Sequence, residues 1–315
     1  MLGKLDPDNF AGGAIKLDAD AAGRSLMRDI GECLSLDALP AAFGVCEVVD
    51  ENMANAARVH AVENGRDVSD NAMIAFGGAA PLHAARLCEK LGIARCLVPR
   101  GAGVGSAIGF LKAPFAYEAL ASRLTRLSGF DAGEVNALLD DLKASAEGFV
   151  RAGTGGGIAR EITAFMRYAG QGWEIPVPLP DAPFGDDAAD DLKERFRTHY
   201  RRFFGRAIDG LDGLEIEVVT WSVKASDVRP DTARHKITAG TRTVEPAATR
   251  AVFDPATGAT QAYAIVERDS LLAGDRVTGP AVIVERETST VVTTPFDAVV
   301  QSDGALLLSR KGSQA

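Results

Sequence analysis

The fold follows most directly from residues 71–99, which read NAMIAFGGAAPLHAARLCEKLGIARCLVP. Asn71–Phe76 is a short apolar run that predicts a strand, and Arg95–Pro99 predicts a second one. Between them lies an apolar stripe at helical spacing that ends before Gly92, formed by Pro81, Ala84, Ala85, Cys88 and Leu91. Strand, glycine turn, helix and strand make a βαβ unit, so we expect the two strands to be parallel.

The Gly77–Gly78 pair occupies the turn between the first strand and the helix. Glycine lacks a Cβ atom, so it suits a place where a ligand must touch the backbone. The start of the following helix offers unpaired N–H groups to a phosphate or to the polar edge of a nucleotide. Glycines also serve tight strand–helix turns without any ligand, and the pair on its own favours this structural interpretation.

A second glycine-rich segment, GVGSAIGFL at residues 103–111, follows about 25 residues later. Small residues one turn apart permit a close crossing with another helix, although each glycine costs about 1 kcal/mol of helix stability. A glycine turn followed by such a helix resembles the second half of the actin-like, ribonuclease H-like ATPases. There the first element contacts adenosine and the second is a hinge helix at the cleft between domains.

Three segments differ in their pattern. Residues 1–125 alternate helix with strand, and residues 126–228 predict an α+β segment whose first helix opens with a capping box at Asp131 and Glu134. Residues 229–315 predict a β-rich C-terminal domain, so the fold class is α/β and α+β. The strands expected in the last two segments are Ile162–Tyr168, Trp173–Val177, Glu215–Lys224, Ala262–Glu267, Ala281–Glu285, Thr290–Thr294, Ala298–Val300 and Leu306–Leu308, with turns at Gly279–Pro280 and Asp303–Gly304.

Composition excludes several classes of protein. The chain has 315 residues, of which 46% are hydrophobic and 24% charged, enough for two domains with cores. Its 34 Lys and Arg against 43 Asp and Glu give a net charge of -9, whereas sequence-independent binding to DNA or RNA needs a basic surface. No apolar run approaches the roughly 20 residues that span a bilayer. We therefore expect no binding to nucleic acid or membrane.

The cysteines point to a reducing compartment. Cys33, Cys46, Cys88 and Cys96 form no C-x-x-C pair, which argues against a structural zinc site. Scattered thiols and the absence of a signal peptide after Met1 predict a cytoplasmic protein.

Several blocks of sequence resemble the hydantoinase A and 5-oxoprolinase family, which includes subunits of ATP-dependent ketone carboxylases. The blocks, in family order, are LDPDNFAGGAIKLD at 5–18, Glu51–Ala54, the stretch from Met73 to Leu111, MRYAGQGWEIPVPLP at 166–180, the pattern Phe196, His199 and Phe204–Gly205, GPAVIVE at 279–285, and Asp303–Gly304. They extend across nearly the whole chain, so the resemblance is much more specific than any single glycine motif.

The resemblance covers only the C-terminal half of the family. Its members usually begin with an actin-like first subdomain that carries an Asp-x-Gly-Gly-Thr phosphate loop, a motif that this sequence does not contain. Because the chain opens with Met1, the resemblance implies a naturally separate subunit. Such a split is similar to that of the acetophenone carboxylases, multisubunit enzymes that use ATP to carboxylate an aromatic methyl ketone, in which this chain would be the gamma-type subunit.

The family resemblance also implies a site. Gly77, Gly78, Ala79, Ala80 and His83 would form the adenosine side of a split ATP site. Partner subunits would supply the missing ATPase half and the carboxylating half, and a partner would hold most of the Mg²⁺ or Mn²⁺. ATP would activate bicarbonate and acetophenone as carboxyphosphate and an enol phosphate, giving benzoylacetate. No residue of this chain is expected to be catalytic or to bind metal.

Two alternatives remain open at this point. One is a subunit of an ATP-dependent hydantoinase or 5-oxoprolinase that hydrolyses a cyclic amide. The other is a non-catalytic assembly subunit with a degenerate ATPase fold. The family commonly has Gly at the position of Ala80, and alanine would be strained there if the position needs a positive φ, which favours the degenerate fold.

Two of the other histidines, His60 and His199, have structural interpretations, and His235 is assigned no role. Asp50 can cap a helix whose apolar face would carry His60, which predicts a packed structural histidine; the other positions of that face are Met53, Ala56 and Ala57. His199, beside Phe196 and Tyr200, predicts helix packing.

Overall fold

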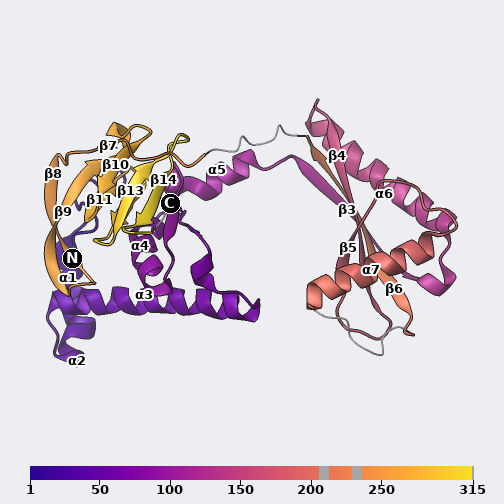
Figure 1. Ribbon diagram of the computed structural model, residues 1–315, viewed down its shortest axis with the longest axis horizontal. Helices are drawn as coiled ribbons and strands as arrows, with labels where there is room; N and C mark the ends of the chain where they lie inside the picture. The colour runs from indigo at the N-terminus through magenta and orange to yellow at the C-terminus, as the bar shows by residue number, and fades with distance from the viewer. Residues whose placement is uncertain (206–212, 229–235, 314–315) are drawn as a thin grey trace. The chain divides into compact units, whose positions relative to one another are not determined.

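The computed structural model describes residues 1–205, 213–228 and 236–313, which form a mixed α/β fold with three sheets (Figure 1). The chain divides into two compact units: a first unit made of Met1–Lys112 and Ala233–Ala315, and a second unit made of Ala113–Thr232. The sequence predicts three consecutive segments. The first and last of them fall largely in one unit, because their strands share a sheet.

The first unit contains a six-stranded sheet in the order β1-β2-β14-β13-β10-β7. Its strands are β1 (Met73–Ile74), β2 (Arg95–Val98), β7 (Arg242–Thr243), β10 (Asp275–Thr278), β13 (Phe296–Val300) and β14 (Leu306–Arg310). The predicted parallel pair is confirmed, since β1 runs parallel to β2 with Met73 opposite Cys96. β14 pairs antiparallel with β2 on one side and β13 on the other, so a late part of the chain joins the βαβ unit to the rest of the sheet.

A four-stranded sheet in the order β12-β11-β9-β8 completes the β structure of the first unit. It consists of β8 (Ala248–Asp254), β9 (Ala259–Glu267), β11 (Ala281–Val284) and β12 (Ser289–Val292). Every residue of β11 and β12 is buried, as expected for strands that are covered on both faces. The predicted strands near 262–267, 281–285 and 290–294 are therefore confirmed.

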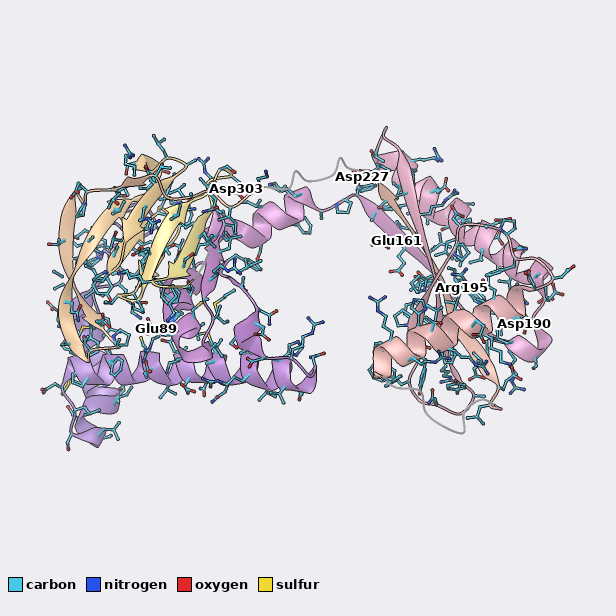
Figure 2. All side chains as sticks on the ribbon, viewed as in Figure 1. Glu89, Glu161, Asp190, Arg195, Asp227 and Asp303 are labelled. Carbon is cyan, nitrogen blue, oxygen red and sulfur yellow. The ribbon has the colours of Figure 1, made fainter. Side chains whose placement is uncertain are left out.

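The first unit has five α-helices among its described residues: α1 (Ala19–Leu26), α2 (Glu32–Leu34), α3 (Ala38–Glu63), α4 (Ala80–Leu91) and α5 (Gly105–Lys112). α4 buries the predicted stripe and ends at Gly92, whose φ of 70° suits glycine. Glu89 of α4, labelled in Figure 2, accepts a hydrogen bond of 2.5 Å from Thr293 Oγ1 after β12. The prediction that Asp50 caps a helix is wrong, because α3 begins at Ala38 and Asp50 lies buried in its middle.

The second unit is a four-stranded antiparallel sheet with two helices. Its strands, in the order β3-β6-β4-β5, are β3 (Ala116–Arg126), β4 (Ile158–Tyr168), β5 (Ile175–Leu179) and β6 (Ile216–Asp227). The helices are α6 (Ala132–Gly153) and α7 (Ala188–Phe204). The predicted cap is confirmed, since Asp131 Oδ1 accepts the N–H of Glu134 at 3.0 Å.

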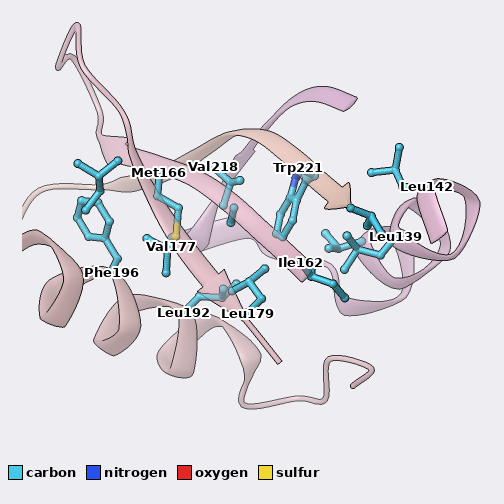
Figure 3. Packing of buried hydrophobic residues seen from close by; sticks show 14 of the residues in the cluster. Leu139, Leu142, Ile162, Met166, Val177, Leu179, Leu192, Phe196, Val218 and Trp221 are labelled. Atoms are coloured by element: carbon cyan, nitrogen blue, oxygen red, sulfur yellow. The ribbon is translucent and has the colours of Figure 1, made fainter. Parts of the chain in front are cut away.

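The core of the second unit lies between this sheet and its helices, as Figure 3 shows. Trp221 and Val218 of β6, Met166 of β4 and Phe196 of α7 are all fully buried. Met166 follows from the alternation of β4, because every second residue of a strand faces the same side, and β5 alternates in the same way.

Short turns of helix connect the larger elements. They are a π-helical turn at Met27–Gly31 and 3₁₀ turns at Val68–Asp70, Ala102–Val104, Leu127–Gly129 and Arg268–Ser270. Within the described part of the chain, no helix is both long enough and apolar enough to cross a membrane.

Candidate functional site

The Gly77–Gly78 turn joins β1 to α4, and its two glycines differ physically. Gly77 has a φ of +113°, a conformation that L side chains rarely adopt, so the backbone itself requires glycine there. Gly78 has no positive φ, and a Cβ built on it meets no atom of the described chain within 4 Å. Neither strain nor internal packing therefore explains glycine at 78. The space over its α-carbon is open to an incoming group.

Two hydrogen bonds fix this turn to neighbouring segments. The N–H of Gly77 donates to the carbonyl oxygen of Ala102 at 2.6 Å, which ties the turn to the loop that follows β2. The hydroxyl of Thr288 donates to the carbonyl oxygen of Gly78 at 2.7 Å, from the turn between β11 and β12. Thr288 is itself buried. The two hydrogen bonds therefore fix the conformation of the turn without a ligand.

The turn borders a cavity of about 410 Å³, called here the turn cavity. Its lining is Leu5, Asp6, Asn9, Phe10, Ala11, Gly78, Ala79, Leu82 and residues 284–289. Ala79 is the N-cap residue of α4, and no side chain of the described residues caps this helix start. Pro81 has no N–H and the N–H of Leu82 donates to the carbonyl oxygen of Ala79 at 3.0 Å, so the N–H of Ala80 is the group of this helix start that can meet a polar ligand.

One lining residue of the turn cavity, Glu285, belongs to a buried ion pair. Glu285 lies 3.1 Å from Nη1 of Arg268, and both side chains are less than a tenth exposed. Burial raises the pKa of Glu285, and the charge of Arg268 offsets only part of this effect. Arg268 also donates to the carbonyl oxygen of Gly304 at 2.7 Å, in the predicted Asp303–Gly304 turn.

One expectation about small residues near the turn is wrong. Ala80 is the first residue of α4, and its φ is not positive, so alanine is unstrained there. Two glycines of the 103–111 segment have an explanation within the chain, whereas Gly109 has no atom of the described chain within 4 Å of a built Cβ. A Cβ on Gly103 would lie 2.6 Å from that of Glu287, and one on Gly105 would lie 3.3 Å from Phe76.

His83 does not line the turn cavity. It borders a neighbouring cavity of about 730 Å³, whereas Gly78 and Ala79 belong to the first one. Nδ1 of His83 lies 2.6 Å from Oδ1 of Asp50, which is buried on α3. His60 is exposed, so its predicted packing role is wrong.

Sequence reasoning missed Thr288 and Arg286 and gave Asp50 a different role, that of a helix cap. Asp50 and His83 are 33 residues apart, and no spacing rule connects them. One signal was available: Asp50 shares a helix face with Ala54 and Ala57, and an acidic residue on the buried face of a helix usually has a specific partner. Thr288 and Arg286 come from the far end of the chain and offered no such signal.

Comparison with known proteins identifies the family. The family model described as hydantoinase/oxoprolinase matches residues 1–119, and the model of the hydantoinase/oxoprolinase C-terminal domain matches residues 133–310. The chain belongs to the hydantoinase/oxoprolinase family. The resemblance stated from the sequence is thus confirmed.

Relatives of this family member include carboxylase subunits and a caprolactamase subunit. The caprolactamase alpha subunit of Pseudomonas jessenii is 27% identical over 92% of this chain and 42% of its own length. The acetophenone carboxylase gamma subunit of Aromatoleum aromaticum is 34% identical over 35% of this chain and 15% of its own length. The nucleotide-free structure of acetone carboxylase superposes with a TM-score of 0.78 at 25% identity, covering 98% of this chain and 45% of that one. The chain therefore spans less than half the length of these relatives.

Within the described residues, no group of three or more His, Cys, Asp or Glu side chains is arranged to hold a metal ion.

Proposed function

We propose that this chain contributes the adenosine side of an ATP site in an enzyme that activates a small carbonyl compound. The observation that carries the proposal is Gly78, where glycine is required neither by the backbone nor by packing, at the edge of a cavity and beside a helix start. A purine or ribose placed over Gly78 would occupy the space that any larger residue would fill.

Gly77, Gly78, Ala79 and the N–H of Ala80, the first residue of α4, would hold the nucleotide in this proposal. His83, also expected at this site from the sequence, borders the neighbouring cavity and is not part of the proposed nucleotide site. ATP, when bound, supplies the phosphoryl group that activates a carbonyl oxygen. A partner carrying the phosphate loop would position that group and hold Mg²⁺ or Mn²⁺.

Ketone carboxylation is the activity that we favour, with acetophenone and bicarbonate as substrates and benzoylacetate as product. The similarity to carboxylase subunits supports it. Hydrolysis of a cyclic amide is the second candidate, because the caprolactamase alpha subunit matches most of this chain. The case for a degenerate assembly subunit is weaker, since it depended on strain at Ala80.

The proposed enzyme needs protein partners, and the first unit has exposed apolar residues that a partner would cover. Phe110 and Leu111 of α5 are 84% and 81% exposed, and Ile74, Phe76 and Val104 are also exposed. Apolar residues gathered in this way often mark an interaction surface. We expect the partner with the phosphate loop to bind here, and we expect the isolated chain not to hydrolyse ATP.

The test compares two valine variants by titration calorimetry with ATP, on the chain and on the complex that co-purifies with it. Gly78→Val fills the space over the turn, and we expect it to weaken ATP binding at least about 10-fold. Gly172→Val is the matched control, because Gly172 also lacks a positive φ and has no atom within 4 Å of a built Cβ. Normal affinity in Gly78→Val would show that the glycine pair is only structural.

A further inference from the structure

The cavity that His83 borders, called here the histidine cavity, lies directly beside the turn cavity. The two cavities share Leu5 and Leu82 as lining residues. Most of its lining is apolar, and its ionisable side chains are those of Lys4, Asp18, Asp20, Cys46, His83 and Arg250. A mostly apolar cavity with a few polar groups is typical of a binding site for a small organic molecule.

His83 is held in this cavity as a proton acceptor. Asp50 is 1% exposed and a carboxylate only accepts hydrogen bonds, so Nδ1 of His83 donates to Oδ1 of Asp50 across 2.6 Å. The neutral ring then has an acceptor at Nε2, which has no partner among the described residues. The Asp50 carboxylate both fixes the ring and stabilises the positive charge that the ring gains with a proton.

Arg250 supplies the complementary charge. Its Nη2 donates to Oδ2 of Asp6 at 2.8 Å, and Asp6 belongs to the lining of the turn cavity. Its Nη1 is buried and has no hydrogen-bond partner within the described part of the chain. Nη1 is too enclosed to contact a ligand, but Arg250 lines the cavity, and its positive charge would stabilise an oxygen anion bound there.

Cys46 is the other reactive group in the cavity, and its environment argues against a nucleophilic role. Burial raises the pKa of the Cys46 thiol, and Asp50 and Glu47 raise it further, while Lys4 acts in the opposite direction. A thiol of this kind stays protonated near neutral pH.

We propose that the histidine cavity binds the carbonyl substrate and that His83 removes a proton from the carbon beside the carbonyl group. The C–H bond breaks, the proton moves to Nε2 of His83, and the electron pair forms a carbon–carbon double bond while the carbonyl oxygen becomes an enolate anion. Arg250 stabilises that oxygen, and Asp50 is a positioning residue for His83. The identity of the substrate as a ketone rests on the proposed function, and the shared wall places the enolate next to the turn cavity.

The experiment follows exchange of methyl protons in D₂O by proton NMR, with acetone and acetophenone as probes and without ATP. We expect the chain, or the complex that co-purifies with it, to exchange at least one probe faster than buffer. His83→Gln should lower the rate about 100-fold, the usual size of general-base catalysis. Arg250→Met should lower it as well. His60→Gln is the control, because His60 is exposed on the surface of α3 and should leave the rate unchanged.

Asp50→Asn tests the positioning role. We expect a slower maximal rate of exchange with an unchanged KM for the probe, because the ring stays in the cavity but loses the carboxylate that fixes its tautomer and orientation. Circular dichroism shows whether each variant is folded.

Failure of this inference and failure of the proposed ATP site are distinguishable. Gly78→Val should keep proton exchange, and His83→Gln should keep ATP binding. Absence of exchange for both probes, or exchange that survives His83→Gln, would overturn the assignment of His83 and leave the ATP site standing.

Discussion

Gly109 and Gly103 lie six residues apart, and alanine should have opposite effects at the two positions. Gly109 is inside α5 with no atom of the described chain within 4 Å of a built Cβ, so Gly109→Ala gains helix propensity of about 1 kcal/mol. A Cβ on Gly103 would lie 2.6 Å from the Cβ and 3.0 Å from the carbonyl oxygen of Glu287. Backbone must move to relieve that contact, and such overpacking costs about 1–3 kcal/mol.

Thermal unfolding followed by circular dichroism measures both effects. For a unit of this size, 1 kcal/mol corresponds to about 2–4 °C in Tm. Gly109→Ala should therefore raise the Tm of the chain by a few degrees and Gly103→Ala should lower it. If a partner helix crosses α5 at Gly109, the same Gly109→Ala variant should lose that partner during purification although it is more stable alone. A lower Tm for Gly109→Ala, or an unchanged one for Gly103→Ala, would refute this account of the glycines.

Three further substitutions test the cores and the buried charges. Phe196→Ala removes a fully buried ring and should cost about 3–5 kcal/mol in urea unfolding; a cost below about 1 kcal/mol would contradict the packing described. Arg268→Met leaves Glu285 buried without its counter-charge and should cost about 3–5 kcal/mol at pH 8. Burial already raises the folded-state pKa of Glu285, so protonation of this carboxylate favours the folded state. The loss of stability in Arg268→Met should therefore be smaller at pH 5 than at pH 8. An equal loss of stability at pH 5 and pH 8 would be inconsistent with this. The hydrogen bond from Arg242 lowers the folded-state pKa of Asp275. The carboxylate of Asp275 therefore stabilises the folded state above the unfolded pKa of about 3.9, and this stabilisation is lost as the pH falls through the folded-state pKa. Asp275→Asn should accordingly lose less stability than the wild type between about pH 5 and pH 2, measured by acid titration of the circular dichroism signal.

Local signals predicted local structure well. The stripe from Pro81 to Leu91 and the terminal Gly92 defined α4 almost to the residue, because helical spacing and a C-terminal glycine report directly on backbone geometry. The same kind of signal misled at Asp50, where an acidic residue before an apolar stripe looked like a cap. The carboxylate is instead stabilised by His83 from another helix, a tertiary contact that no local pattern encodes.

Much of the site could not be predicted, because it depends on contacts between residues that are far apart in the sequence. The glycine turn was found from the sequence, but the residues that hold it and line its cavity, Thr288 and Arg286, lie more than 200 positions further along the chain. The division between the turn cavity and the histidine cavity was also not predictable, since it depends on which side of α4 each side chain of the first turn faces.

The position of β14 has a consequence for biosynthesis. The six-stranded sheet cannot be completed until Leu306–Arg310 has left the ribosome, because β14 stands between β2 and β13. The second unit, by contrast, has its whole sequence available once Thr232 has emerged. We therefore expect the second unit to fold first. Until β14 is synthesised, the βαβ segment before it has an unpaired edge at β2. Such an edge invites pairing with the wrong strand, so the nascent chain should depend on chaperones for the interval between these two events.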